Sequence, residues 1–213
     1  MRLYHLVSGH ELRRRFRIAI PVYVAWIVAY EVVARTALRL PAHNIATSVD
    51  TLIPLQPAWV WIYELTYVMP IAALFIINDA RRFDRAVWAI AIASIAAFVV
   101  YVAFPVTFPR PSLGHGLAEH VLAMEYHYDS NSNHLPSLHV ANVFILYFAI
   151  RGPRLGRWGN HAALVIALLV SASTVLVKQH LVADVITGAL LGWLAHLVAL
   201  RIIPGSEQTH VRA

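Results

Sequence analysis

Two histidines and an aspartate are the residues in this sequence best suited to chemistry. His180 and Asp184 are four residues apart, a spacing that puts both side chains on one face of a helix. A carboxylate that accepts a hydrogen bond from one imidazole nitrogen orients the ring, and the other nitrogen is then available as a nucleophile or base. His139 supplies a second imidazole directly after Pro136-Ser137-Leu138. Charged groups beside apolar segments are usually paired or functional, which favours an active site.

Positive charge accompanies both histidines. Arg110 lies in the run Phe-Pro-Arg-Pro at 108–111, and Lys178 lies two residues before His180. Arginine binds two phosphate oxygens at once, whereas lysine acts as a point charge. The N-termini of helices add unpaired N–H groups that suit an anion. Two imidazoles, a carboxylate and several cationic donors therefore predict phosphoryl transfer, which depends largely on positioning and electrostatic stabilisation.

The composition indicates what holds these residues in place. Of 213 residues, 59% are hydrophobic and only 13% are charged, and the mean hydropathy is +0.62. This leaves too little polar surface for a soluble globule and predicts an integral membrane protein. The absence of cysteine excludes disulfides, thiolate catalysis and cysteine-based zinc or iron–sulfur sites. The net charge is +6, and the basic residues that produce it lie between apolar spans. We therefore interpret them as a signal of membrane topology and expect no nucleic-acid partner.

Six apolar windows are long enough, or nearly so, to cross a membrane. We therefore expect an all-α, six-transmembrane-helix bundle that forms a single domain over residues 1–213. The first window is too long for a signal peptide, and we interpret it as a retained anchor. The windows are 18–38, 58–77, 86–104, 136–150, 162–177 and 181–203.

The basic residues predict the orientation of these spans. Thirteen of the seventeen Lys and Arg residues, Arg2, Arg154 and Arg212 among them, lie before span one, between spans two and three, between four and five, or after six. The positive-inside rule then places both termini in the cytoplasm. Spans four and six begin at the outer (periplasmic or extracellular) face, and the long loop 105–135 lies there too. The candidate residues would meet at this face, which implies a lipid phosphate with its tails in the bilayer.

The motifs resemble those of the type 2 phosphatidic acid phosphatase superfamily of six-helix membrane phosphatases and phosphotransferases. That family has Lys-x6-Arg-Pro, Pro-Ser-x-His and Ser-Arg-x5-His-x3-Asp. The first motif is present only as Arg110-Pro111, because Ala103 occupies the lysine position. The second is Pro-Ser-Leu-His at 136–139. The third keeps its spacing from Ser173 to His180 and Asp184, with Thr174 in place of arginine.

The resemblance implies a role for each matched residue. His180 would take the phosphoryl group as phosphohistidine, Asp184 would orient it, and His139 would protonate the leaving alcohol and then activate the acceptor. Arg110 and Ser137 would bind phosphate, and we expect Lys178 to replace part of the missing charge. The Pro-Ser-Leu-His form also resembles the inositol phosphorylceramide synthase branch, whose members transfer a phosphorylated headgroup between lipids.

Simpler interpretations stay open for these residues. The His180–Asp184 pair could be structural, Arg110 could touch lipid headgroups, Ser137 could cap a helix, and Lys178 could extend to the interface. We expect no cofactor and no metal, since the spacings of the outer-loop residues match no standard metal signature. Those residues are His115, His120, His127, Asp129 and His134. Gly188 and Gly192 predict close helix packing, within the bundle or between subunits of a homo-oligomer.

Three functions follow from this sequence. Hydrolysis of a lipid phosphate or pyrophosphate is the first expectation, because water is abundant at the outer face. Transfer of a phosphorylated headgroup to a lipid alcohol is the second. A non-enzymatic anion or lipid transporter is the third, although binding alone does not need a His–Asp pair beside a second histidine. The related vanadate-dependent haloperoxidases are soluble, and the missing Lys and Arg argue against vanadate binding.

Overall fold

The structure is a computed structural model that describes residues 7–153 and 155–204. Arg2, Arg154 and Arg212, which were counted for the orientation, lie outside the described residues. The prediction of an all-helical fold is confirmed for the part of the chain that is described. The helices in chain order are α1 Gly9–Ala37, α2 Ser48–Leu52, the 3-10 helix η1 Pro57–Trp59, α3 Val60–Tyr63, α4 Leu65–Ile76, α5 Ala80–Ala103, α6 Leu117–Tyr128, α7 Leu138–Ile150, α8 Gly156–Leu176 and α9 Val182–Ile202.

Five segments are long and apolar enough to cross a membrane: Gly9–Ala37, Pro57–Ile76, Ala80–Ala103, Gly156–Leu176 and Val182–Ile202. They correspond to five of the six expected spans. The other expected span, 136–150, is the shorter apolar helix α7 of 13 residues. At about 1.5 Å per residue, such a helix is shorter than the roughly 30 Å of hydrocarbon in a bilayer.

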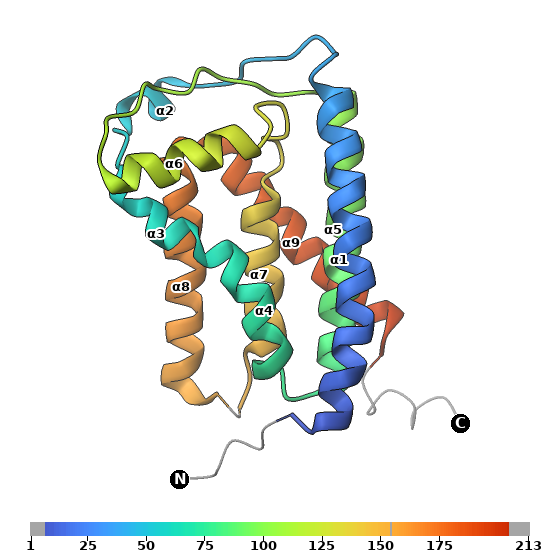
Figure 1. Cartoon of the computed structure of the whole chain (residues 1–213). Coiled ribbons are helices and arrows are strands. Elements are labelled where there is room, and N and C mark those ends of the chain that lie inside the picture. The colour runs from blue at the N-terminus through green and yellow to red at the C-terminus, as the bar shows by residue number, and fades with distance from the viewer. Residues whose placement is uncertain (1–6, 154, 205–213) are drawn as a thin grey trace.

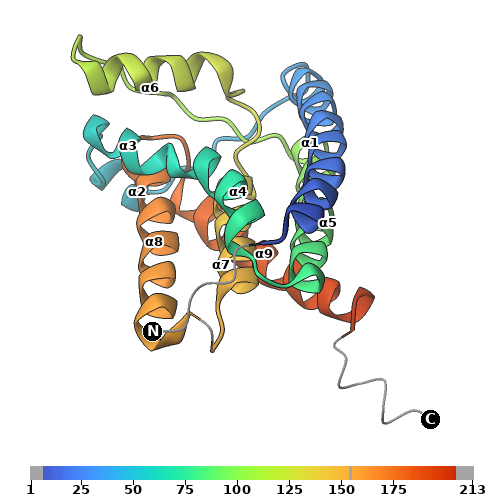
Figure 2. The same ribbon diagram turned by 60° about the horizontal axis from the view of Figure 1, so that its bottom comes forward.

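The helices run between two faces of the bundle. Figure 1 shows that α1 begins and α9 ends at one end, which we call the terminal face. The opposite end, where α7 and α9 begin, we call the site face. Helix α6 lies across the site face, over the end of the bundle where α7 and α9 begin (Figures 1 and 2). The expected loop 105–135 therefore contains a helix, which the sequence analysis did not predict.

Small residues let the central helices pack closely. Ala89, Ala93 and Ala97 of α5 are fully buried and lie on one face of that helix, towards α7 and α9. Small side chains at such contacts are typical of membrane helix packing. Ile95 and Val99 of the same helix are 65% and 64% exposed. Large apolar side chains on the outside of a bundle need hydrocarbon around them, which agrees with a membrane location.

Helices α7 and α9 meet backbone to backbone. A Cβ atom on Gly188 would collide with the carbonyl oxygen of Ser137, and one on Gly192 would collide with that of Ala141. Glycine is therefore required at both positions for this contact. The close packing predicted from these two glycines is confirmed within the chain, between α7 and α9. A homo-oligomer stays a prediction that these glycines no longer support.

Candidate active site

The two motif segments are tied together where α7 and α9 begin. The Ser137 hydroxyl accepts a hydrogen bond from the Val140 N–H (3.3 Å) and caps α7. The Ser137 N–H donates to the backbone oxygen of Asp184 (3.0 Å). The Asp184 carboxylate accepts a hydrogen bond from the Leu181 N–H (2.8 Å), within the first turn of α9. Residues more than 40 positions apart are thus held by direct bonds.

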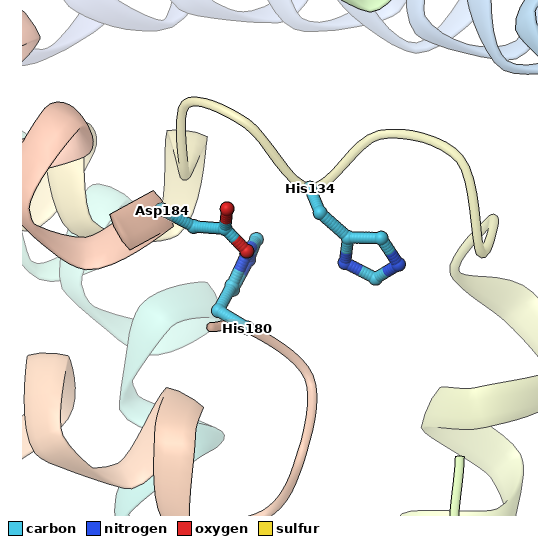
Figure 3. A group of neighbouring side chains, drawn as sticks. All are labelled: His134, His180 and Asp184. Carbon is cyan, nitrogen blue, oxygen red and sulfur yellow. The ribbon is translucent and has the colours of Figure 1, made fainter. Parts of the chain in front are cut away.

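His180 reaches Asp184 in a way that the sequence analysis did not predict. Helix α9 begins at Val182, so His180 precedes it, and the expected pairing along one helical face is wrong. The chain turns tightly after α8, with Lys178 in the left-handed region at φ 56°. The N–H of His180 donates to the Thr174 carbonyl (3.0 Å) and closes this turn. His180 Nδ1 then lies 3.4 Å from Asp184 Oδ2 (Figure 3).

The second imidazole, that of the half-buried His139, lies next to this buried pair. His139 Nδ1 lies 3.2 Å from His180 Nε2, and His180 and Asp184 are almost fully buried. If Asp184 holds the proton of His180 on Nδ1, the Nε2 lone pair faces His139, and His139 Nδ1 must carry the proton between them. The structure therefore brings together the three residues expected to be catalytic. Their roles stay predictions.

Tyr63 extends this chain and was missed in the sequence. Its hydroxyl lies 3.0 Å from His139 Nε2, and the tyrosine is fully buried. With the proton of His139 on Nδ1, Nε2 accepts a hydrogen bond from this hydroxyl. Tyr63 thereby fixes the tautomer in which His139 points its proton at His180. Tyr63 is the last residue of the short helix α3 and lies inside an apolar segment. In the sequence, a tyrosine at such a position is indistinguishable from an ordinary core residue.

Replacing Tyr63 by phenylalanine should lower kcat about tenfold with little change in KM, because the ring still packs but His139 loses its orienting donor. The limb of the kcat–pH profile that reports the ionisation of His139 should also move, because His139 has lost a hydrogen bond. Tyr128→Phe, at an exposed tyrosine of α6, is the matched control. An unchanged kcat and pH profile in Tyr63→Phe would show that the contact with His139 has no part in turnover.

His134 is a third imidazole at the site. His134, His180 and Asp184 each offer one possible ligand atom, and these three atoms lie within 4.8 Å of one another, a grouping that could hold a metal (Figure 3). However, His134 Nδ1 lies 2.9 Å from the carbonyl oxygen of Gln179, and Nε2 lies 2.7 Å from Asn131 Oδ1. Both nitrogens thus already have a partner within hydrogen-bond distance, and a metal would have to displace one of them. His134 instead braces the turn that carries His180.

Acid should destabilise the protein through these histidines. Burial, together with the neighbouring imidazole in each case, lowers the pKa of His180 to about 3 and that of His134 to about 4. Histidine in an unfolded chain titrates near ~6.5. Between about pH 6.5 and 4 the unfolded chain therefore binds protons that the folded chain does not, so stability falls as the pH falls. The melting temperature of His134→Gln should therefore fall less than that of the wild type when the pH is lowered from 7.5 to 4.5.

The matched control for this titration is His120→Gln, at an exposed histidine of α6. It should follow the wild type across the same range, because its side chain is exposed to solvent and is not part of the buried cluster. An identical acid response in all three proteins would contradict the buried, neutral state assigned to His134.

Comparison with known families places this geometry in context. A sequence model of the PAP2 superfamily matches residues 36–198. The chain belongs to the PAP2 superfamily. Comparison with curated proteins and with solved structures returned no match. The matched range includes His139, His180 and Asp184, and membership supports a phosphatase-type function in general.

Arg110, from the first PAP2-like motif, is anchored close to His180. Its guanidinium donates to the carbonyl oxygen of Tyr126 (2.6 Å) and to Gln179 Oε1 (2.7 Å), the residue before His180. It also lies 4.7 Å from the centre of the Tyr126 ring. Its buried Nε has no partner among the described residues, which leaves a donor for an anion. Arg110 thus ties α6 to the turn, and phosphate binding stays a prediction.

Lys178 is held elsewhere. Its ammonium group donates to the carbonyl oxygens of Asp50 (2.8 Å) and Ile53 (2.5 Å), at the end of α2. Asp50 in turn accepts a hydrogen bond from the N–H of Val182 (2.8 Å), at the start of α9. Lys178 therefore fastens α2 to the His180 turn, and phosphate binding by Lys178 would cost both bonds.

Two residues depart from the PAP2 motifs, and the structure shows what they do. Thr174, in the arginine position, is fully buried, and its hydroxyl donates to the Ser171 carbonyl (2.8 Å). Its own carbonyl oxygen accepts from the N–H groups of Gln179 (2.9 Å) and His180 (3.0 Å). Ala103, in the lysine position, is the last residue of α5 and is exposed. The cationic cradle of the family is thus reduced, and Thr174 contributes backbone support.

Proposed function

We propose that the chain is a membrane phosphatase that cleaves the phosphate of a lipid phosphate or pyrophosphate through a phosphohistidine intermediate. One observation carries the proposal: the side chains of His139, His180 and Asp184 lie within 3.2 and 3.4 Å of one another in turn, with His180 and Asp184 buried, at one end of a bundle of apolar helices. The position favours a substrate whose tails lie in the bilayer and whose headgroup reaches the helix ends. A complete six-span bundle, with α7 as the short fourth span, is part of this proposal.

The contacts suggest how the reaction proceeds. The lone pair on His180 Nε2 attacks phosphorus, and the bond from phosphorus to the lipid oxygen breaks. His139 takes up a second proton together with the anionic substrate, and it passes one proton to the departing oxygen and is left neutral. Neutral His139 then takes a proton from water, whose oxygen attacks the phosphohistidine and restores His180. Asp184 stabilises the charge on the His180 ring, so the mechanism needs no cofactor.

Transfer of a phosphorylated headgroup to a lipid alcohol is the second candidate. The observation that favours it is the burial of the proposed nucleophile, since His180 is only 3% exposed. A phosphohistidine shielded from bulk water would last longer, which favours attack by a second lipid. The two reactions share every catalytic group and differ only in the acceptor.

A panel of lipids in detergent tests both candidates. Phosphatidic acid, phosphatidylglycerol phosphate, a polyprenyl pyrophosphate and an inositol lipid are each incubated with the protein, alone and with a lipid alcohol. Release of inorganic phosphate supports hydrolysis, and a new phospholipid formed without phosphate release supports transfer. If no lipid yields either product, the proposed function is wrong.

We further propose that the site face lies outside the cytoplasm and that both termini lie inside it. The basic residues that support this include Arg13, Arg81 and Arg201, all near the terminal face. Cysteine substituted at Ser130 should react with a membrane-impermeant maleimide added from outside intact cells. Labelling only after the cells are broken would reverse the orientation.

A further inference from the structure

A second polar site lies at the terminal face, at the far end of the bundle from the histidine pair. A pocket of about 180 Å³ opens where α5 begins and where α7 and α9 end. Three arginines and a histidine line it: Arg82, Arg85, Arg151 and His196. The proposed phosphatase function uses none of them.

The arginines are held in place by neutral groups. Arg82 donates to the carbonyl oxygen of Arg151 (2.5 Å), and Arg85 Nε donates to that of Ile203 (2.7 Å). The Arg151 guanidinium lies 5.1 Å from the centre of the Phe148 ring, and the His196 ring stacks on the same ring with the two centres 4.9 Å apart. These contacts fix the side chains but leave their charges unneutralised.

The contrast with nearby arginines is informative. Arg14, also near the terminal face, pairs with Asp84 at 2.7 Å, and Arg15 pairs with Glu11 at 3.0 Å. Across residues 7–153 and 155–204, none of the three pocket arginines forms an ion pair with a carboxylate. Three guanidinium groups around one small pocket repel each other, and an anion held between them would relieve that repulsion.

We propose that this pocket binds the phosphate group of an anionic phospholipid in the leaflet at the terminal face. Guanidinium groups bind phosphate oxygens in pairs, and basic pockets between membrane helices suit lipid headgroups. The last two turns of α9 also expose Val198 and Ile202, which are 44% and 46% exposed and can contact acyl chains. A headgroup in the pocket and tails along α9 fit this arrangement better than a soluble phosphate does.

Binding of short-chain phosphatidylglycerol to the full chain in neutral detergent tests the proposal, with phosphatidylcholine of the same chains as reference. The double variant Arg85→Gln/Arg151→Gln should weaken phosphatidylglycerol binding about tenfold or more, since it removes two charge-assisted contacts. The matched control is Arg81→Gln/Arg157→Gln, which removes the same charge from exposed arginines that do not line the pocket. It should stay within about twofold of the wild type, because surface charges contribute little.

Three results would overturn the proposal. Equal weakening in both double variants would show diffuse attraction by surface charge. Equal binding of phosphatidylcholine would show that the headgroup charge is not recognised. Displacement of phosphatidylglycerol by millimolar inorganic phosphate alone would assign the pocket to a soluble anion. If Arg85→Gln/Arg151→Gln melts well below the wild type without lipid, the exposed Arg151→Gln alone replaces it, with Arg157→Gln as its control.

Discussion

His180→Ala should abolish turnover while the protein still binds its lipid. Loss of a nucleophile that works as part of a unit costs on the order of 10⁴-fold or more in rate. Binding should fall only a few-fold, because the phosphate donors and the lipid-facing surface remain. Product formation from the lipid panel measures the first effect, and binding of the same lipid phosphate measures the second.

The control for this variant is His120→Ala, which removes an exposed imidazole from α6 on the same face. It should leave both turnover and binding unchanged. Turnover by His180→Ala at the wild-type rate would exclude the phosphohistidine mechanism. Binding without turnover in the wild type itself would favour a transporter or lipid-binding protein, which needs the cationic donors but no reacting histidine.

His139→Ala should separate the two halves of the reaction. With an alkyl phosphate, kcat should fall about 10²- to 10⁴-fold, because the departing alkoxide lacks its proton donor. A nitrophenyl phosphate has a leaving group that needs no proton, so His180 should still be phosphorylated. Without His139 to activate water, the phosphohistidine should then accumulate. The expected signal is one equivalent of nitrophenol per protein, followed by slow release of phosphate.

Imidazole added to His139→Ala provides a matched test, because the small base can enter the space left by the ring. It should speed phosphate release in His139→Ala and leave His180→Ala inactive. Equal loss of rate with both esters, and no burst of nitrophenol, would contradict the assignment of His139 as the acid and base.

The sequence predicts which candidate site residues meet better than it predicts how they are held. The motif spacing brings His139, His180 and Asp184 together, and the structure places them in contact. The expected span began at Leu181, one residue before α9, but His180 was wrongly placed on the same helix as Asp184, because the turn that carries His180 depends on the Thr174 carbonyl. A backbone acceptor leaves no mark in the pattern of side chains.

The residues that were missed share a physical reason. Tyr63 lies in an apolar segment, and His134 lies among several loop histidines, so neither stands out by type or spacing. Each is singled out only by a distant partner, His139 for Tyr63 and Gln179 for His134. Helix α6 escaped for a related reason, because its sequence is moderately polar and its length falls short of a membrane span.

The glycine contact between α7 and α9 has a consequence for how the protein responds to its lipid environment. Because Gly188 and Gly192 bring the backbones of α7 and α9 into contact, the distance between the His139 and His180 rings is determined by packing inside the protein. A thicker or thinner bilayer would tilt the pair as one unit without pulling the rings apart. Sterols or short acyl chains would then change how a substrate arrives, and leave the geometry in which it reacts unaltered.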